Sequence, residues 1–119
     1  MITFGNGVPM SLRVAARLRS HGVRARVCDL RWLAPLPLSD VLVEAERTGR
    51  VLVVDETRHD GGVGEGVVTG LVEGRFIGPI RRVASLNSFV PLGTAAQHVL
   101  LGEDEIEKAA VEVAGMDRG

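Results

Sequence analysis

Hydrophobic residues along the chain follow two spacings, one typical of strands and one typical of helices. Runs that alternate or are continuously β-branched predict four strands, at Met1–Phe4, Val23–Leu30, Val51–Asp55 and Ile80–Ala84. Apolar residues at helical spacing lie between and after them. The expected helices run from Pro9 to just before Gly22, from Ser39 to Thr48, from the glycines at residues 61–66 to about Glu73, from Thr94 to Leu101 and from Gly102 to Ala114. Residues 87–93 are expected to form a loop.

The order of these elements predicts an α/β fold in one domain. Strands that alternate with helices are joined by helical crossovers, so we expect a mostly parallel sheet with helices on both faces. A continuous apolar strand such as Val51–Asp55 is typical of a strand that is covered on both sides. Ser39 is expected to cap its helix, and Gly22 and Gly49 are expected to end theirs.

The segment DETRHDGGVGEG, residues 55–66, is the most unusual part of the chain. It follows an apolar strand and opens a predicted helix, an arrangement that in other proteins cradles phosphate. Three interpretations compete: a phosphate site, a catalytic loop with His59 as its base, and a tight start to a helix. If the first and third strands are neighbours, this segment and residues 5–9 flank one crevice, and Asn6, His59 and Gly62 are its candidate residues.

The spacing of the glycines argues against phosphate binding. Residues 62–66 read G-x-G-x-G and not G-x-G-x-x-G, and they do not follow the first strand. The acids Asp55, Glu56 and Asp60 would also repel a phosphate. The preferred interpretation is structural: small residues let the helix approach its sheet, and carboxylates such as Asp55 or Asp60 satisfy its exposed amides. His59 is then expected to be solvated.

The remaining polar residues point to no catalytic or metal site. His21, His59, His98 and Cys28 are dispersed and do not have the spacing of metal ligands. His21 is expected to interact with a helix end, and His98 is expected to be half-buried. Trp32 is interpreted as a core or interface anchor. No catalytic, cofactor-binding or metal-binding residue is therefore assigned.

Composition and charge narrow the partners. The net charge is −1 and there is no basic block, so nucleic acid is not expected. No apolar stretch approaches the ~18 residues that a membrane span needs, so no membrane is expected. The single Cys28 cannot form an internal disulfide, which favours a reducing compartment such as the cytoplasm.

Five segments in this order and spacing resemble a known family: MITFGNGVPMSLRVAARL, VCDLRWLAPLP, TGRVLVVDET, GGVGEGVV and FVPLG. They resemble the C-terminal domain of transketolase-like, thiamine diphosphate-dependent enzymes. The similarity is greatest to the β subunit, or the β half of a fused chain, of 2-oxo acid dehydrogenase first components. It implies a three-layer α/β/α sandwich with strand order 2-1-3-4. It also implies a larger enzyme, from which this chain would be a fragment that lacks an upstream antiparallel edge strand.

The resemblance also implies where the chemistry lies. In that family the diphosphate and magnesium motif begins Gly-Asp-Gly in another domain, and the activating glutamate lies in a third. This chain has no Gly-Asp-Gly, so thiamine diphosphate and magnesium are expected only in the parent enzyme and the chain alone is expected to be inactive. The implied partners are the remaining domains, a second copy across a dimer interface and the acyltransferase core, whose binding domain tends to be basic.

An acidic helix start is the candidate surface for that core. It consists of Glu103, Asp104, Glu105 and Glu107. The alternative is a solvated first turn whose acids complement the helix dipole. Two other functions stay open: the same domain from deoxyxylulose phosphate synthase or a transketolase, which would be a carboligase or transferase, and a stand-alone module that binds a small ligand in the crevice.

Overall fold

The computed structural model describes residues 1–58, 60–85 and 101–116. Strands and helices alternate along the chain in the order β1 (Ile2–Thr3), α1 (Gly7–Leu18), η1 (Arg19–His21), β2 (Cys28–Asp29), α2 (Leu38–Thr48), β3 (Val51–Arg58), α3 (Val63–Glu73), β4 (Ile80–Ser85) and α4 (Glu103–Ala114). The predicted loop at residues 87–93 and the predicted helix at residues 94–101, except for Leu101, lie outside the described residues. His59 and His98 also lie outside them.

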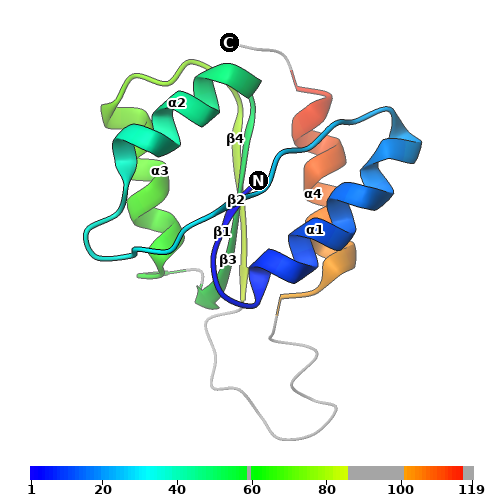
Figure 1. Cartoon of the computed structure of the whole chain (residues 1–119), viewed down its shortest axis with the longest axis horizontal. Coiled ribbons are helices and arrows are strands. Elements are labelled where there is room, and N and C mark those ends of the chain that lie inside the picture. Colours follow the sequence, from blue (N-terminus) through cyan, green and yellow to red (C-terminus); the bar gives the residue numbers. More distant parts are fainter. Residues whose placement is uncertain (59, 86–100, 117–119) are drawn as a thin grey trace, which may run out of the picture.

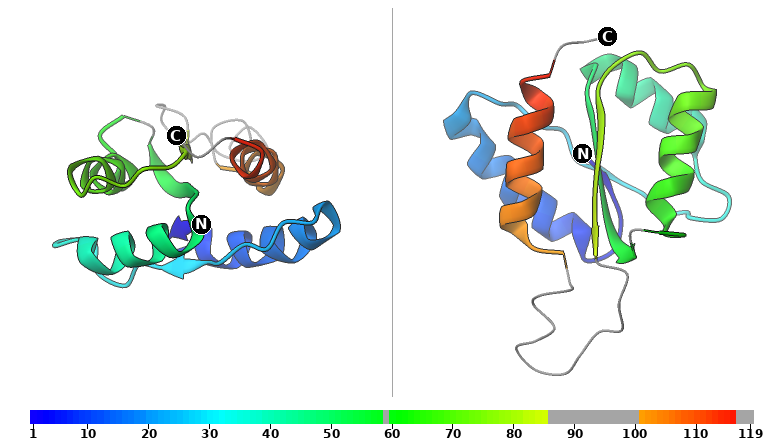
Figure 2. Two further views of the ribbon diagram at one scale, coloured as in Figure 1. Left: turned by 90° about the horizontal axis from the view of Figure 1, so that it is seen from above. Right: turned by 180° about the vertical axis from the view of Figure 1, so that it is seen from behind.

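The described strands form one sheet in the order β2-β1-β3-β4, and every pairing in it is parallel. Helices α2 and α3 cover one face, and α1 and α4 cover the other (Figure 1). The view from above in Figure 2 shows the same two helical layers on either side of the strands. The predicted α/β fold and strand order are confirmed.

Strand β3 supplies residues to both hydrophobic cores. Val51 and Val53 belong to the core beneath α2 and α3, while Leu52 and Val54 belong to the core beneath α1 and α4. None of the four is more than 3% exposed. The continuous apolar run therefore reflects burial on both faces, as its sequence predicted.

Strand β2 is much shorter than the predicted Val23–Leu30. Only Cys28 and Asp29 pair with β1, because β1 itself offers just two ladder positions. Val23 and Ala25 still pack against the core beneath α1 and α4, and Arg24 is exposed. Partly buried and exposed side chains therefore alternate along the segment as predicted, but most of its residues do not pair with a strand.

Two smaller expectations were wrong. Helix α2 begins at Leu38, after Pro37, so Ser39 lies inside the helix and caps nothing. Strand β3 continues to Arg58 through a bulge opposite Ser85, so it includes residues that were expected to form a turn. Trp32 is 72% exposed, which excludes the core alternative and leaves its role as an interface anchor a prediction. Gly22 and Gly49 do end their helices, both in the left-handed conformation.

Ion pairs connect α1 to α4 across the outer surface. Glu103 accepts hydrogen bonds from Arg13 Nε at 3.0 Å and from Arg17 NH1 at 3.1 Å. Glu107 lies 3.4 Å from Arg17 and 3.8 Å from His21 Nε2. The hydrogen bonds from Arg13 and Arg17 lower the pKa of Glu103 below its ordinary value of 4.5. The acidic helix start is therefore partly neutralised within the chain.

We expect Arg17→Gln to lower the urea midpoint of unfolding slightly at neutral pH, because exposed ion pairs contribute little each. The lowered pKa of Glu103 sets the pH window. The contribution of the ionised Glu103 to stability is complete above pH 4.5, and it is lost as the pH falls below that value and the carboxylate takes up a proton. The difference between Arg17→Gln and the wild type should therefore shrink below pH 4.5.

The matched control for this measurement is Arg19→Gln. Arg19 is exposed and has no ion pair with any residue in the described part of the chain. Its substitution should leave the midpoint unchanged at both pH values. Equal effects of the two substitutions would contradict a specific role for the pairs between α1 and α4.

Candidate functional site

The candidate crevice lies where β1 and β3 end. These strands are neighbours in the sheet, with Thr3 opposite Val54, so the loops that follow them lie side by side. Asn6 immediately precedes α1, and Gly62 immediately precedes α3. The predicted juxtaposition of the two loops is confirmed. His59, the third candidate residue, lies outside the described residues.

The side chain of Glu56 spans the space between these loops. Its Oε1 accepts a hydrogen bond from Asn6 N at 3.3 Å, and its backbone oxygen accepts one from Ser85 Oγ at 3.0 Å. A Cβ on Gly5, whose φ is +55°, would collide with the same carboxylate. Glycine at this position therefore permits both the turn and the approach of Glu56. Sequence reasoning missed this contact, because it depends on the pairing of β1 with β3.

Asp55 is completely buried at the end of the regular part of β3. Its Oδ2 accepts a hydrogen bond from Gly64 N in the first turn of α3. Its Oδ1 accepts one from Thr57 N at 2.8 Å and another from Thr57 Oγ1. Thr57 Oγ1 in turn accepts a hydrogen bond from Val63 N at 3.3 Å. One buried carboxylate thus organises the turn and the start of the helix.

These contacts decide between the interpretations of the glycine-rich turn. The first three backbone amides of α3 are all hydrogen-bonded. Val63 N donates to Thr57 Oγ1, Gly64 N donates to Asp55 Oδ2, and Glu65 N donates to Gly62 O. A phosphate at this position would have to displace the buried side chain of Asp55, which already accepts these hydrogen bonds. The expectation that Asp55 satisfies the amides of the helix is confirmed, and the described residues of the turn do not fit a phosphate group.

Two glycines of α3 differ in what surrounds them. A Cβ on Gly64 would lie 2.8 Å from Asp55 Oδ2 and 2.9 Å from Arg82 Cδ. A Cβ on Gly66 would meet only Leu36 Cδ1, at 3.1 Å. The need for a small residue where the helix approaches the sheet is therefore confirmed at Gly64, where the neighbour is the buried carboxylate.

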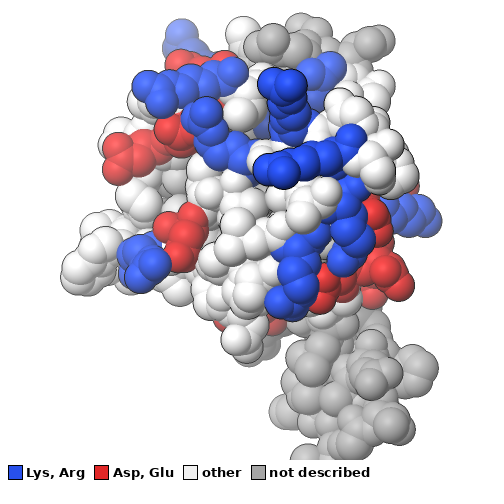
Figure 3. Space-filling model, turned by 45° about the vertical axis from the view of Figure 1, so that its right-hand side comes forward, with Lys and Arg blue, Asp and Glu red and all other residues white. Residues whose placement is uncertain are grey.

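The proposed docking acids divide into two pairs. Glu103 and Glu107 contact arginines of α1, as described above, whereas Asp104 and Glu105 are exposed. Figure 3 shows the side of the molecule that carries α1 and α4, where Lys and Arg side chains form a band and the acids lie at its margin. Only Asp104 and Glu105 present their charge outward, and docking through them stays a prediction.

Other chemistry-bearing groups are isolated. Within the described ranges, no three His, Cys, Asp or Glu side chains are grouped so that they could hold a metal ion. Cys28 is half-buried, and burial raises the pKa of its thiol, which leaves it a poor nucleophile. In the same part of the chain no helix has the length and apolar character needed to cross a membrane.

Comparison with known proteins places this architecture in a family. Residues 1–111 match the family described as transketolase, C-terminal domain. The chain belongs to that family. A solved structure titled "Split gene transketolase, inactive beta4 tetramer" has the same fold as this transketolase C-terminal domain, with a TM-score of 0.81 and 24% identity over 94% of this chain and 36% of the other.

The domain is also similar to curated proteins over most of its length. It is 37% identical to the pyruvate dehydrogenase E1 component subunit beta of Staphylococcus aureus, over 92% of this chain and 35% of that protein. The subunit of the same name from Bacillus subtilis is 30% identical, over 95% of this chain and 36% of the relative. The chain therefore spans about a third of the length of these relatives.

We expect Asp55→Asn to lower the free energy of unfolding by about 1–3 kcal/mol. The asparagine side chain keeps one oxygen that can accept a hydrogen bond. Its NH₂ group replaces the other oxygen and would face the backbone N–H of either Gly64 or Thr57, so that two donors meet. Urea unfolding monitored by circular dichroism measures the change.

Asp40→Asn is the matched control for this substitution. Asp40 is an exposed acid in the first turn of α2, and its replacement should change the free energy of unfolding by less than roughly 0.5 kcal/mol. Asp55→Asn with wild-type stability would show that the buried carboxylate does not hold the start of α3.

Gly64→Ala should destabilise the domain by about 1–3 kcal/mol, because the new methyl group would press on Asp55 while Asp55 is held by hydrogen bonds. Gly66→Ala, two residues along the same helix, should be neutral or stabilising by up to about 1 kcal/mol through helix propensity, because Leu36 can move aside. Urea unfolding of both variants gives the comparison. Similar effects of the two substitutions would show that the approach of Gly64 to Asp55 is unimportant.

Proposed function

We propose that this chain is the C-terminal domain of a thiamine diphosphate-dependent 2-oxo acid dehydrogenase, from its β subunit or from the β half of a fused chain. The observation that carries the proposal is the 37% identity to a pyruvate dehydrogenase E1 subunit beta over 92% of this chain. In this proposal the complete enzyme oxidatively decarboxylates a 2-oxo acid and passes the acyl group to a lipoyl acceptor. The domain serves that enzyme without supplying a reacting group.

The geometry of the carboxyl edge supports a non-catalytic role. Among the described side chains at the end of β3, those of Asp55, Glu56 and Thr57 are all hydrogen-bonded within the domain. The glycine-rich turn also does not fit the diphosphate of the cofactor, because the first amides of α3 are already hydrogen-bonded. Thiamine diphosphate and magnesium are therefore assigned to other domains of the parent enzyme.

Assembly and docking are the proposed tasks of this domain. Trp32 and Leu33 are 72% and 39% exposed in the segment between β2 and α2. An exposed tryptophan beside a leucine is typical of a protein interface, and we assign this pair to contacts with the remaining domains or with a second copy. Asp104 and Glu105 are assigned to a basic binding domain of the acyltransferase core. The reduced Cys28 is compatible with the cytoplasm.

The experiment is a calorimetric titration of the chain with the acyltransferase of the same organism, at low and high salt. We expect binding that weakens as salt is added, because exposed charges are screened. The double variant Asp104→Lys, Glu105→Lys should bind about tenfold more weakly or worse, since it places cations against a basic partner.

The control is Glu73→Lys, which reverses an exposed acid on α3, across the sheet from α4. It should bind the acyltransferase as the wild type does. Wild-type affinity in the double variant would remove the docking surface from the proposal. Stabilisation of the chain by thiamine diphosphate with magnesium in a thermal melt would contradict the assignment of the cofactor to other domains.

A further inference from the structure

Two buried hydroxyl groups lie at the inner side of α1. Thr3 is the last residue of β1, Ser11 lies in the second turn of α1, and both are 0% exposed. In the part of the chain that the structure describes, neither Thr3 Oγ1 nor Ser11 Oγ has a hydrogen-bond partner. No part of the proposed function uses these two groups.

The side chain of Thr3 points at the first turn of α1. Thr3 lies opposite Asp29 of β2 and Val54 of β3, so its backbone is held between two strands. A Cβ on Gly7, the first residue of α1, would collide with Thr3 Oγ1 and would lie 3.6 Å from the backbone oxygen of Val54. The absence of a side chain at Gly7 therefore leaves room beside the hydroxyl, close to a carbonyl oxygen.

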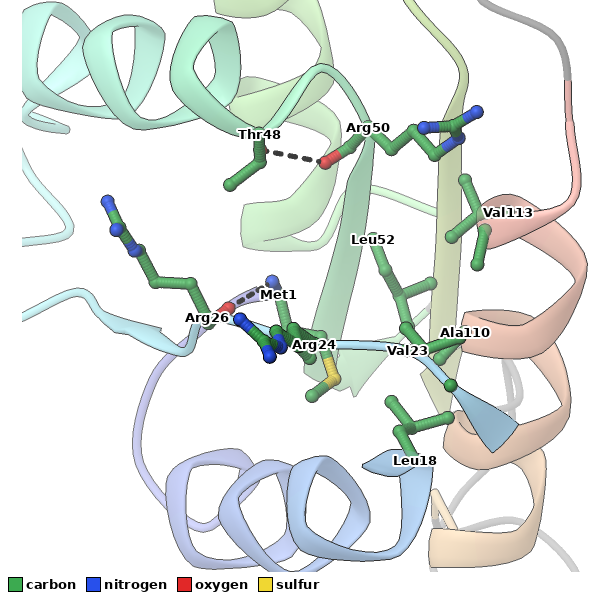
Figure 4. A pocket seen from close by; sticks show the side chains of 13 residues that line it. Met1, Leu18, Val23, Arg24, Arg26, Thr48, Arg50, Leu52, Ala110 and Val113 are labelled. Carbon is green, nitrogen blue, oxygen red and sulfur yellow. Dashed lines mark hydrogen bonds between the residues drawn. The ribbon is translucent and has the colours of Figure 1, made fainter. Parts of the chain in front are cut away.

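Ser11 lies on the same face of α1 as Gly7. The two residues are four positions apart, which is about one helical turn, and both are buried. The buried face continues through Val14 to Leu18, which packs with Leu52 in the core beneath α1 and α4 (Figure 4). The inner face of α1 is therefore apolar toward its C-terminal end and polar toward its N-terminal end, where Thr3 lies.

A buried hydroxyl without a partner is unfavourable, because folding removes it from water and supplies no hydrogen bond in return. Buried polar groups in proteins are for this reason nearly always bound to other protein groups or to ordered water. A buried water makes about three hydrogen bonds. Thr3 Oγ1, Ser11 Oγ and the backbone oxygen of Val54 offer that number of polar atoms around the first turn of α1.

We propose that one buried water molecule binds beside Gly7 and joins Thr3 and Ser11. It donates hydrogen bonds to the backbone oxygen of Val54 and to one hydroxyl, and it accepts a hydrogen bond from the other hydroxyl. The carbonyl can take part because its oxygen has two lone pairs. The water thereby ties the N-terminal end of α1 to the sheet, and with it the adjoining Asn6 of the crevice.

The direct test is a crystal structure of the chain at a resolution that shows ordered water. We expect one water within hydrogen-bond distance of both Thr3 Oγ1 and Ser11 Oγ. The double variant Thr3→Val, Ser11→Ala should have no water at this place. A direct hydrogen bond between the two hydroxyls would overturn the proposal, and so would the absence of solvent density beside Gly7.

Urea unfolding gives an independent test in solution. Thr3→Val and Ser11→Ala each remove one partner of the water and leave the other hydroxyl in place, so each should lower the unfolding midpoint. The double variant removes both hydroxyls together with the need for the water. Its loss should therefore be smaller than the sum of the two single losses, as expected for coupled groups.

The control for these variants is Ser39→Ala, which removes the hydroxyl of an exposed serine inside α2 and should not lower the midpoint. Single variants at Thr3 and Ser11 that raise the midpoint would show that the hydroxyls have no partner in the native protein, which contradicts the proposal. Additive losses would show that the two hydroxyls do not share a partner.

Discussion

The burial of β3 on both faces is the constraint on which the rest of this structure depends. Consecutive residues of a strand point to opposite faces, so Val51–Val54 supply both cores at once. A polar residue anywhere in this stretch would lie in one core or the other. The strand therefore has to be continuously apolar, and each layer of helices packs on the β3 side chains that point to its face.

The end of that strand explains the hydrogen bonds of the glycine-rich turn. Asp55 is the first polar residue after the apolar run, and it is still completely buried. A buried carboxylate needs hydrogen-bond donors, and the amides of Thr57 and Gly64 supply them. The edge at which α/β proteins commonly bind ligands is occupied here by the internal requirements of the turn. This supports the proposal that the domain serves its enzyme without supplying a reacting group.

The two edges of the sheet differ in their polar contacts. At the carboxyl edge, the side chains of Asp55, Glu56 and Thr57 turn back and accept hydrogen bonds from backbone amides of the neighbouring loops and of α3. At the amino edge, Arg24 and Arg26 lie in the segment before β2 and are exposed, and Arg26 pairs with Glu44 of α2.

How much of this could be predicted from the sequence depends on the range of each interaction. Local patterns determined most of the strands and helices and the glycines that end η1 and α2. They also predicted that Asp55 or Asp60 binds the amides of α3, and Asp55 takes this role with partners that lie within nine residues of it. The length of β2, the bridge from Glu56 to Asn6 and the pairs between Arg17 and Glu103 were decided only by tertiary structure. Each joins segments that are distant along the chain. Their contacts depend on strand register and on which helix faces meet, and neither can be predicted from the residues of one segment alone.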